Sequence, residues 1–250
     1  MSFGRAERHC QGDQVMAAVI FDTETTGKND PKLVEAAGIV LDGDGVEIDL
    51  RAVARYCERY NPGKPIEPGA LATHHILDED VASCPPAESF NIHDWFASPD
   101  DFVYLIGHNV DYDWDVIGKP DCRRIDTLAL YRRFFPELDS HSLGAVVYFI
   151  LPHEQARRLL KDKAHGGAAD CEATRHILLK CLAGVKKMGF PLTWEGLWQC
   201  SEECRIPTHF PFGKHRGVPL SELPRDYVDW CLRNLSDIDP YLRDALNRLI

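Results

Sequence analysis

The sequence predicts an α/β fold in which a mixed β-sheet is flanked by helices, with a small C-terminal module. Short apolar runs that are typical of buried strands occur at residues 17–21, 33–41 and 102–106. The first three predicted strands follow one another in hairpin order, whereas the later strands alternate with helical patterns. Such an order predicts a sheet with both antiparallel and parallel neighbours, covered by helices.

The first half of the chain contributes three strands. Ala17–Phe21 is short and apolar, and Leu33–Leu41 is followed by Asp42-Gly43-Asp44-Gly45, a strong hairpin signal. Val46–Tyr56 alternates well enough to predict the third strand. Asn61-Pro62-Gly63-Lys64-Pro65 then breaks the chain. Helical periodicity follows over residues 67–75 and 86–97.

The second half alternates strands with helices. Phe102–Ile106 predicts a fourth buried strand, and Arg124–Leu128 predicts a short fifth strand that runs into a helix ending near Phe135. Two further helices are predicted over residues 142–151 and 153–160. The strongest helical pattern covers residues 170–187, with an apolar stripe of Ala173, Ile177, Cys181 and Val185.

Chain breaks and composition divide the protein into three predicted parts. Residues 1–15 are polar and are expected to form a flexible leader. Residues 16–188 form the predicted main domain, because Gly189-Phe190-Pro191 marks a boundary. Residues 189–250 form the small module, which ends in an amphipathic helix with a stripe of Leu242, Ala245, Leu246 and Leu249.

The composition is typical of a globular protein, with 44% hydrophobic residues among 250. The chain contains no run of about 18 apolar residues and no apolar segment near its start, so neither a transmembrane helix nor a signal peptide is expected. The nine cysteines include no CxxC pair, which indicates reduced thiols. We therefore expect a cytoplasmic protein without membrane contact.

The formal net charge of −11 argues against a strong non-specific grip on nucleic acid, which depends on clustered Lys and Arg. It does not exclude a nucleic-acid enzyme, because carboxylates that bind a metal count as negative until the metal arrives. Any basic contact with nucleic acid would have to be local.

Asp22 and Glu24 lie two residues apart at the end of the first apolar run, so a strand would point both side chains to one face. Two carboxylates in that position repel each other unless a cation neutralises them. Hard oxygen ligands this close favour Mg²⁺ or Mn²⁺. The alternative is a strand-end turn with two solvated acids.

A second acidic cluster, Asp111, Asp113 and Asp115, follows the fourth predicted strand. The helix dipole favours acids in a first helical turn, so simple helix capping is an alternative to metal binding. The spacing alone does not choose among the three.

A third cluster joins His165 to Asp170 through Gly166-Gly167. Five residues on an ideal helix correspond to about 500°, so two side chains at that spacing would diverge by roughly 140°. The glycine pair keeps His165 on a loop while Asp170 starts the long helix, and both can then face one site. The alternative is an exposed loop His and an ordinary helix-start Asp.

Together the clusters supply four carboxylates, counting one from the middle cluster, and one His, which suits two-metal hydrolysis of a phosphodiester. Two divalent ions about 3.5–4 Å apart hold the attacking water and the leaving oxygen in line. A neutral His, with a reference pKa of about 6.5, can take the proton from water near neutral pH.

Three segments, in their order and spacing, resemble the motifs of the DEDDh family of 3′–5′ exonucleases: residues 21–27, residues 108–113, and His165 with Asp170. The resemblance extends over about residues 15–187 and implies a ribonuclease H-like fold. It singles out Asp113, since the matching acid follows the aromatic Tyr112. It implies His165 as general base and two Mg²⁺ or Mn²⁺ ions per active site, held by Asp22, Glu24, Asp113 and Asp170.

The same resemblance implies where the substrate lies. Thr25, Thr26 and Gly27 would line the pocket for the terminal nucleotide, and Asn109 would contact it too. Residues 65–76 resemble the family's substrate-side helix, which places His74 near the scissile end. A structural role for His74, capping its own helix, remains open.

Residues 208–217, followed by residues 226–230, resemble the C-terminal module of the exodeoxyribonuclease X branch of this family. Glycines bracket Lys214 and Arg216 like a tight turn, and we expect both cations to contact phosphates. Phe210 and Phe212 either stack on unpaired bases or belong to a small core. A zinc site is a less favoured alternative, because the spacing is irregular for the residues concerned, Cys200, Cys204, His209 and His215.

The sequence thus predicts a metal-dependent 3′–5′ exonuclease that hydrolyses DNA, single-stranded ends first, to nucleoside 5′-monophosphates. An RNA-trimming exoribonuclease on the same scaffold and a non-catalytic nucleic-acid-binding module are the alternatives. The expected partner is DNA, with RNA as the alternative.

Overall fold

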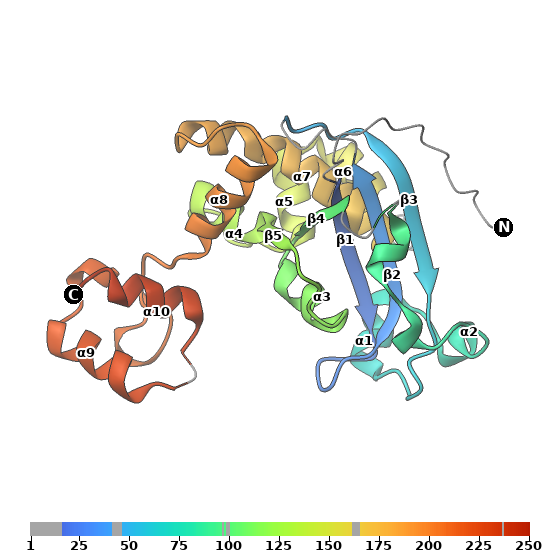
Figure 1. The fold of residues 1–250 in the computed structure, drawn as a ribbon, viewed down its shortest axis with the longest axis horizontal. Coiled ribbons are helices and arrows are strands. Elements are labelled where there is room, and N and C mark those ends of the chain that lie inside the picture. Colours follow the sequence, from blue (N-terminus) through green and yellow to red (C-terminus); the bar gives the residue numbers. More distant parts are fainter. Residues whose placement is uncertain (1–16, 42–46, 97, 99–100, 162–165, 237) are drawn as a thin grey trace.

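A computed structural model describes residues 17–41, 47–96, 98, 101–161, 166–236 and 238–250. Its centre is a five-stranded sheet in the order β3-β2-β1-β4-β5 (Figure 1). The central strand β1 pairs antiparallel with β2 and parallel with β4, while β2–β3 is antiparallel and β4–β5 is parallel. The predicted mixed sheet flanked by helices is confirmed. The strands are β1 Ala17–Thr25, β2 Leu33–Leu41, β3 Ala52–Arg59, β4 Phe102–Gly107 and β5 Arg123–Asp126.

Ten α-helices lie in the described residues. They are α1 Pro68–His74, α2 Asp78–Val81, α3 Val110–Val116, α4 Thr127–Phe134, α5 Leu143–Ile150, α6 His153–Lys161, α7 Gly167–Lys187, α8 Trp194–Arg205, α9 Arg225–Asn234 and α10 Pro240–Asn247. None of these helices is long and apolar enough to cross a membrane.

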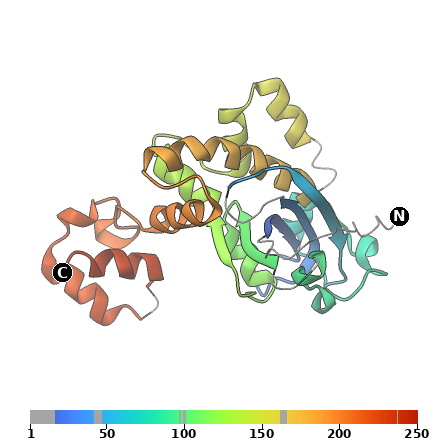
Figure 2. The same cartoon turned by 45° about the horizontal axis from the view of Figure 1, so that its top comes forward.

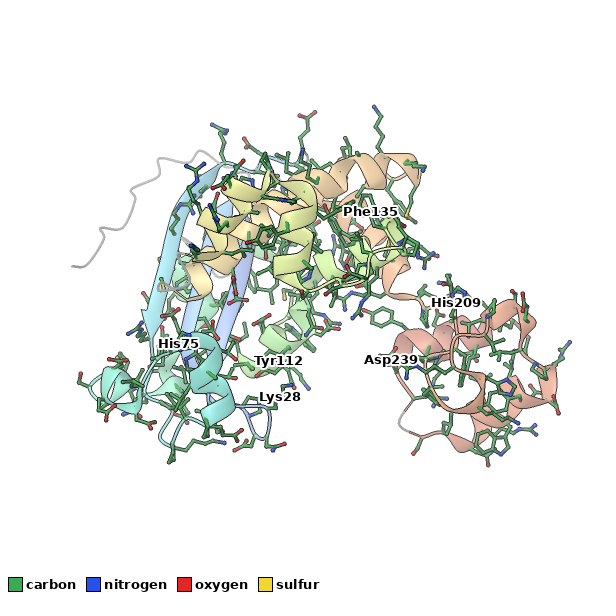
Figure 3. The ribbon with its side chains drawn as sticks, turned by 180° about the vertical axis from the view of Figure 1, so that it is seen from behind. Lys28, His75, Tyr112, Phe135, His209 and Asp239 are labelled. Atoms are coloured by element: carbon green, nitrogen blue, oxygen red, sulfur yellow. The ribbon has the colours of Figure 1, made fainter. Side chains whose placement is uncertain are left out.

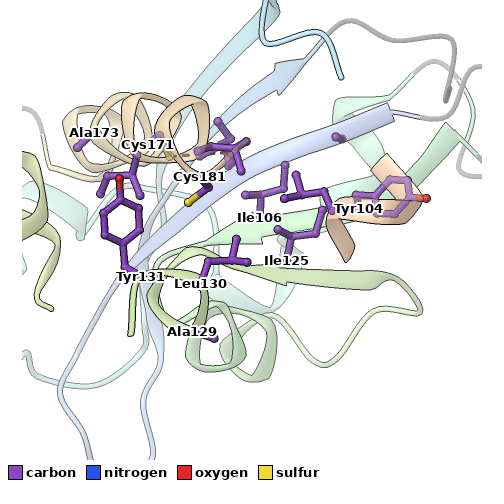
Figure 4. Packing of buried hydrophobic residues seen from close by; sticks show 14 of the residues in the cluster. Tyr104, Ile106, Ile125, Ala129, Leu130, Tyr131, Cys171, Ala173 and Cys181 are labelled. Atoms are coloured by element: carbon purple, nitrogen blue, oxygen red, sulfur yellow. Dashed lines mark hydrogen bonds between the residues drawn. The ribbon is translucent and has the colours of Figure 1, made fainter. Parts of the chain in front are cut away.

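Alternation along β1 decides which layer each side chain joins. Ala18 and Ile20 face the layer of α4, α5, α7 and α8, and Figure 4 shows how this layer packs on the sheet around Ile106, Ile125 and Tyr131. The odd residues Val19 and Phe21 belong to the opposite cluster, with α3 and the aromatic residues before β4. Since β1 continues to Thr25, Asp22 and Glu24 lie on the α7 side.

The predicted helix over residues 86–97 is wrong. Ala87–Ser89 and Ile92–Trp95 form two separate 3₁₀ turns instead. Tertiary packing of the aromatic residues determines the conformation of this segment. The Trp95 ring lies 4.7 Å from the Tyr56 ring, nearly parallel to it, and 5.6 Å from the Phe21 ring, so it is fixed over the sheet rather than along a helix face.

A separate hydrophobic cluster, which we call the C-terminal cluster, lies beyond α8 and is drawn from residues 206–236 and 238–246. Helix α8 itself buries Trp194, Leu197 and Cys200 in the same core as the sheet. The change from one cluster to the other therefore falls near Ile206, C-terminal to Gly189. Figures 1 and 2 show α9 and α10 apart from the sheet, with α8 between them.

Candidate active site

Asp22, Glu24 and Asp170 meet where the end of β1 faces the start of α7. Asp170 lies in the first turn of α7, which packs against both β1 and β2. One carboxylate oxygen from each of the three residues lies within 4.8 Å of the other two. Three hard oxygen donors at this spacing fit a divalent cation of the Mg²⁺ or Mn²⁺ type.

The close approach of α7 depends on Gly167. A Cβ on this residue would lie 2.9 Å from the Ala37 Cβ and 3.0 Å from Asp22 Oδ2. The first distance is well inside the usual 3.5–4.0 Å separation of carbon atoms. Glycine thus lets the helix start sit directly on β1 and β2, which brings Asp170 to Asp22.

Asp113 reaches the same place from α3, around the edge of β1. The parallel pairing of β1 with β4 ends at Ile20, so later N–H groups on that edge need other partners. Asp113 Oδ1 accepts hydrogen bonds from the Thr23 backbone N–H (2.9 Å) and the Thr23 hydroxyl (2.6 Å). These bonds fix the Asp113 carboxylate beside Thr23, which lies between Asp22 and Glu24.

The electrostatics match a site that needs cations. Burial raises the pKa of Asp22 well above its usual value, and the charges of Asp113, Asp170 and Glu24 raise it further. Burial also raises the pKa of Asp113 to about 7, although its hydrogen bonds from Thr23 act in the opposite direction. Without a cation, this cluster therefore favours protons.

The three acids of the middle cluster have different surroundings. Asp111 is paired with Arg124 (2.6 Å) and with Arg205 (2.7 Å), and Asp115 pairs with Lys119 on the surface. Only Asp113 of these three is placed at the end of β1. Tertiary contacts thus make the distinction that spacing could not.

The predicted pocket residues lie at the same end of β1. The Thr25 hydroxyl and Tyr112 Oη are 2.7 Å apart, and Figure 3 shows Tyr112 on α3 close to the loop of Lys28. Thr26 is buried, and its carbonyl accepts from the Glu67 N–H. Gly27 is buried beside it, and its carbonyl accepts from Tyr112 Oη at 3.4 Å.

His74 is buried and uses both ring nitrogens within the protein. Nδ1 accepts from the Ile76 N–H (3.0 Å), so Nε2 carries the hydrogen and donates to the Thr25 carbonyl (3.2 Å). Burial lowers its pKa, which keeps the ring neutral. These contacts favour the structural alternative, in which His74 ties α1 to the end of β1.

Asn109 is exposed and stands just before α3, with φ at 80°. Its backbone N–H donates to Asp126 Oδ1, and its side chain borders a cavity of about 530 Å³ shared with His108, Arg132 and Ser140. His165 lies outside the described residues, as does the leader of residues 1–15.

In the C-terminal part, Lys214 and Arg216 are exposed on a turn next to α9. Phe210 is buried in the local cluster, whereas Phe212 is 42% exposed. The zinc alternative gains no support. Cys200 and Cys204 pack on Met188 in the main core, and no described cluster of metal-ligand types forms around them.

Glu35 is an important residue that the sequence reasoning missed. It lies on β2 directly opposite Glu24, is almost fully buried, and is ion-paired with Arg59 at 3.1 Å. Its Oε1 accepts the Gly167 backbone N–H at 3.1 Å. The sequence feature that could have revealed it is a single acidic residue within the apolar run of residues 33–41.

Carboxylates from the central strand and from two helices, gathered at one edge of a mixed sheet, define a nuclease of the DEDDh type. The chain belongs to the exonuclease family (RNase_T), which matches residues 19–178. The protein is thus a 3′–5′ exonuclease and a hydrolase, from a family that depends on divalent metal.

Two curated relatives illustrate the range of matches. Exodeoxyribonuclease 10 of Escherichia coli (strain K12) is 28% identical over 234 residues, which cover 92% of this chain and 97% of that protein. The 3′–5′ exonuclease DinG of Bacillus subtilis (strain 168) is 24% identical over 185 residues, which cover 69% of this chain but 18% of DinG.

Solved structures show the same fold. Exonuclease X in complex with 5′-overhanging duplex DNA matches with a TM-score of 0.54 and 23% identity, over 74% of this chain and 99% of that one. The complex of E. coli exonuclease I with single-stranded DNA matches with a TM-score of 0.53 and 19% identity, over 70% and 42% of the two chains.

Proposed function

We propose that the protein is a 3′–5′ exodeoxyribonuclease that releases nucleoside 5′-monophosphates, starting on single-stranded ends. The observation that carries this proposal is the meeting of Asp22, Glu24 and Asp170 within 4.8 Å, with Asp113 fixed beside them. The exodeoxyribonuclease that matches nearly the whole chain supports DNA as the substrate.

We infer that this donor set would hold two Mg²⁺ or Mn²⁺ ions. Asp22, Glu24 and Asp170 would hold one ion, and Asp22 with Asp113 would hold the second. When bound, the ions supply an activated water and neutralise charge on the leaving oxygen. His165 would accept the proton of that water, and Thr25, Thr26, Gly27 and Asn109 would surround the terminal nucleotide. His74, which the sequence also predicts near the scissile end, would hold α1 against Thr25.

Two further predictions belong to this proposal. Lys214 and Arg216 would contact phosphates of the substrate. The division into a main domain of residues 16–188 and a module of residues 189–250 stays a prediction, although α8 of the second part packs in the core of the first. The cytosolic location expected from the sequence stays a prediction.

The deciding experiment is digestion of matched 5′-labelled DNA and RNA oligonucleotides with Mg²⁺, Mn²⁺ or EDTA, beside the Asp22→Asn protein. We expect a metal-dependent ladder that shortens from the 3′ end of DNA and is absent with Asp22→Asn. Faster cutting of RNA would transfer the assignment to exoribonucleases. No cleavage of either substrate would contradict the proposed catalysis.

His165→Ala is expected to slow hydrolysis by about 10²–10⁴-fold, the usual range for loss of a general base. The measurement is kcat at neutral pH under saturating metal, with His153→Ala as the control, because His153 starts α6 and belongs to none of the acidic clusters. A loss below about tenfold would remove His165 from this role.

A further inference from the structure

The C-terminal cluster carries a row of exposed and half-buried rings, with two exposed cations, that the acidic site does not use. Trp230 is 48% exposed, and its ring lies 5.9 Å from that of Tyr227, only 14° from parallel. The ring of His215 continues the row, with its centre 4.3 Å from the centre of the Tyr227 ring. We call this row, with Phe212, Lys214 and Arg216, the aromatic–cationic surface.

Local structure explains why these side chains gather. Tyr227 and Trp230 are three residues apart on α9 and so share one face. The turn of Lys214 and His215 is held against this face by backbone bonds of Phe210, whose N–H donates to the Val218 carbonyl and whose carbonyl accepts from the Gly217 N–H, both at 2.8 Å. The ring of Phe210 fills the core beneath.

The arrangement leaves binding groups available to a partner. Single exposed apolar residues are ordinary, but contiguous exposed apolar surface marks interaction sites. Here the exposed ring of Trp230 adjoins the half-exposed ring of Tyr227. Lys214 Nζ lies 5.2 Å from the Tyr227 ring centre. In the described part of the chain, neither Lys214 nor Arg216 forms an ion pair.

The distribution of charge along the chain favours binding of an anion at the C-terminal cluster rather than at the rest of the protein. Residues 206–250 contain six Lys and Arg and six Asp and Glu, so residues 1–205 carry the whole net charge of −11. The C-terminal cluster is therefore the part of the chain that repels an anionic strand least.

The number of cations and rings on the aromatic–cationic surface indicates which class of anionic partner it fits. Membrane recognition uses about four to eight clustered cations, and duplex binding likewise depends on many phosphate contacts. Two cations are too few for either. Single-stranded nucleic acid combines few phosphate contacts with bases that stack on aromatic rings, at about 1–3 kcal/mol per base.

We propose that the aromatic–cationic surface binds single-stranded DNA, on the 5′ side of the terminus that enters the acidic site. Bases stack on Trp230 and Phe212, and Lys214 and Arg216 contact phosphates. The placement relative to the active site rests on the proposed function. Since the C-terminal cluster lies apart from the sheet, only a strand of several nucleotides engages both places (Figure 2).

The test measures binding of fluorescent oligothymidylates of about 5 and about 30 nucleotides to full-length Asp22→Asn protein in EDTA. Trp230→Ala in this background is expected to weaken binding of the long strand by about 5- to 150-fold, the equivalent of removing one stacked base. The matched control is Phe149→Ala on α5, an aromatic with 49% exposure outside the surface, which should keep the affinity.

A second variant tests the proposal if Trp230→Ala fails to fold. Lys214→Ala with Arg216→Ala should reduce the slope of log affinity against log salt by about 1.4, because each phosphate that a cation neutralises on a single strand adds about 0.7 to that slope. Unchanged affinity and unchanged slope would overturn the proposal. Equal competition by a blunt duplex would also overturn it.

Hydrolysis distinguishes this proposal from the proposed function. In otherwise wild-type protein with Mg²⁺, the ratio of kcat/KM on the long strand to that on the short strand should fall with Trp230→Ala. If neither strand is cut, the exonuclease proposal fails while a Trp230-dependent affinity would still support the surface. If both are cut with an unchanged ratio, the surface proposal fails alone.

Discussion

Glu35 is the buried side chain that connects the sheet to the start of the active-site helix α7. Its carboxylate accepts the Gly167 N–H and balances Arg59, so both a helix-terminal donor and a cation depend on it. Because Glu24 is its neighbour across β1 and β2, any shift of β2 would directly reach the carboxylates that are proposed to bind metal.

Glu35→Ala is expected to destabilise the protein by about 1–3 kcal/mol, the cost of leaving a buried donor without its acceptor. It should also lower kcat more than it raises KM, because Asp170 would lose its fixed position. The control is Arg55→Ala. Arg55 on β3 forms an ion pair with Glu172 on α7, so it also connects a strand to this helix, but at the surface. That pair should be worth less than about 1 kcal/mol. Equal effects of the two variants in denaturant titrations would contradict this role for Glu35.

The raised pKa values of Asp22 and Asp113 predict how pH acts on the metal-free protein. The folded protein holds protons that the unfolded chain releases near pH 4, so this stabilisation is complete below about pH 4 and is lost as pH rises through about 7. The thermal midpoint in EDTA should therefore fall between about pH 5 and 8 relative to that of Asp113→Asn, whose amide does not titrate.

Metal should reverse this trend, because it binds the deprotonated carboxylates. Added Mn²⁺ is expected to raise the midpoint more at about pH 8 than at about pH 5. A wild-type curve parallel to that of Asp113→Asn throughout this window would show that Asp113 titrates normally.

At the scale of elements, α3 is held between the sheet and α8 through Asp111. Arg205 on α8 is buried and stacks 5.4 Å from the Tyr241 ring, while Arg124 lies 4.1 Å from the Trp114 ring. Asp111 forms ion pairs with both guanidinium groups. Since α3 also carries Asp113, this pairing fixes the direction from which that carboxylate reaches β1.

The two partners of this ion pair should not be equivalent. Among the described residues, Asp111→Ala leaves the buried Arg205 cation with Glu202, at 3.4 Å, as its ion-pair partner. We expect a loss of about 3 kcal/mol. Arg205→Met should cost only about 1 kcal/mol, because Asp111 is half-exposed and keeps Arg124. Asp115→Ala, which removes an exposed pair on the same helix, is the control. Chemical denaturation would contradict the asymmetry if Arg205→Met cost more.

Elements governed by local pattern could be predicted from the sequence, and those governed by tertiary contact could not. Strand β2 and helix α7 follow from apolar period and length, and both were predicted close to their bounds. The segment of residues 86–97 has helical spacing, yet Trp95 decides its path by packing on Tyr56. Likewise, Asp111 and Asp113 have similar sequence contexts, and only Arg205 and Thr23 give them different roles.

At the scale of the whole molecule, the core around the sheet and the C-terminal cluster are joined by little packing. Tyr241 of α10 donates to Glu202 of α8 and faces Arg205. Beside this contact lies a cavity of about 520 Å³, bordered by Trp198 and Ile206. Weak packing at this junction predicts that the C-terminal cluster opens independently of the sheet.

Leu246→Ala should therefore act locally. Leu246 is fully buried in the C-terminal cluster, and a Leu→Ala change in a core costs about 2–5 kcal/mol. Hydrogen exchange is expected to quicken in α9 and α10 while α7 keeps its protection. Leu178→Ala, equally buried on α7, should give the reverse pattern. Quickened exchange in all three helices with either variant would mean that the junction transmits stability, and that the two clusters unfold as one cooperative unit.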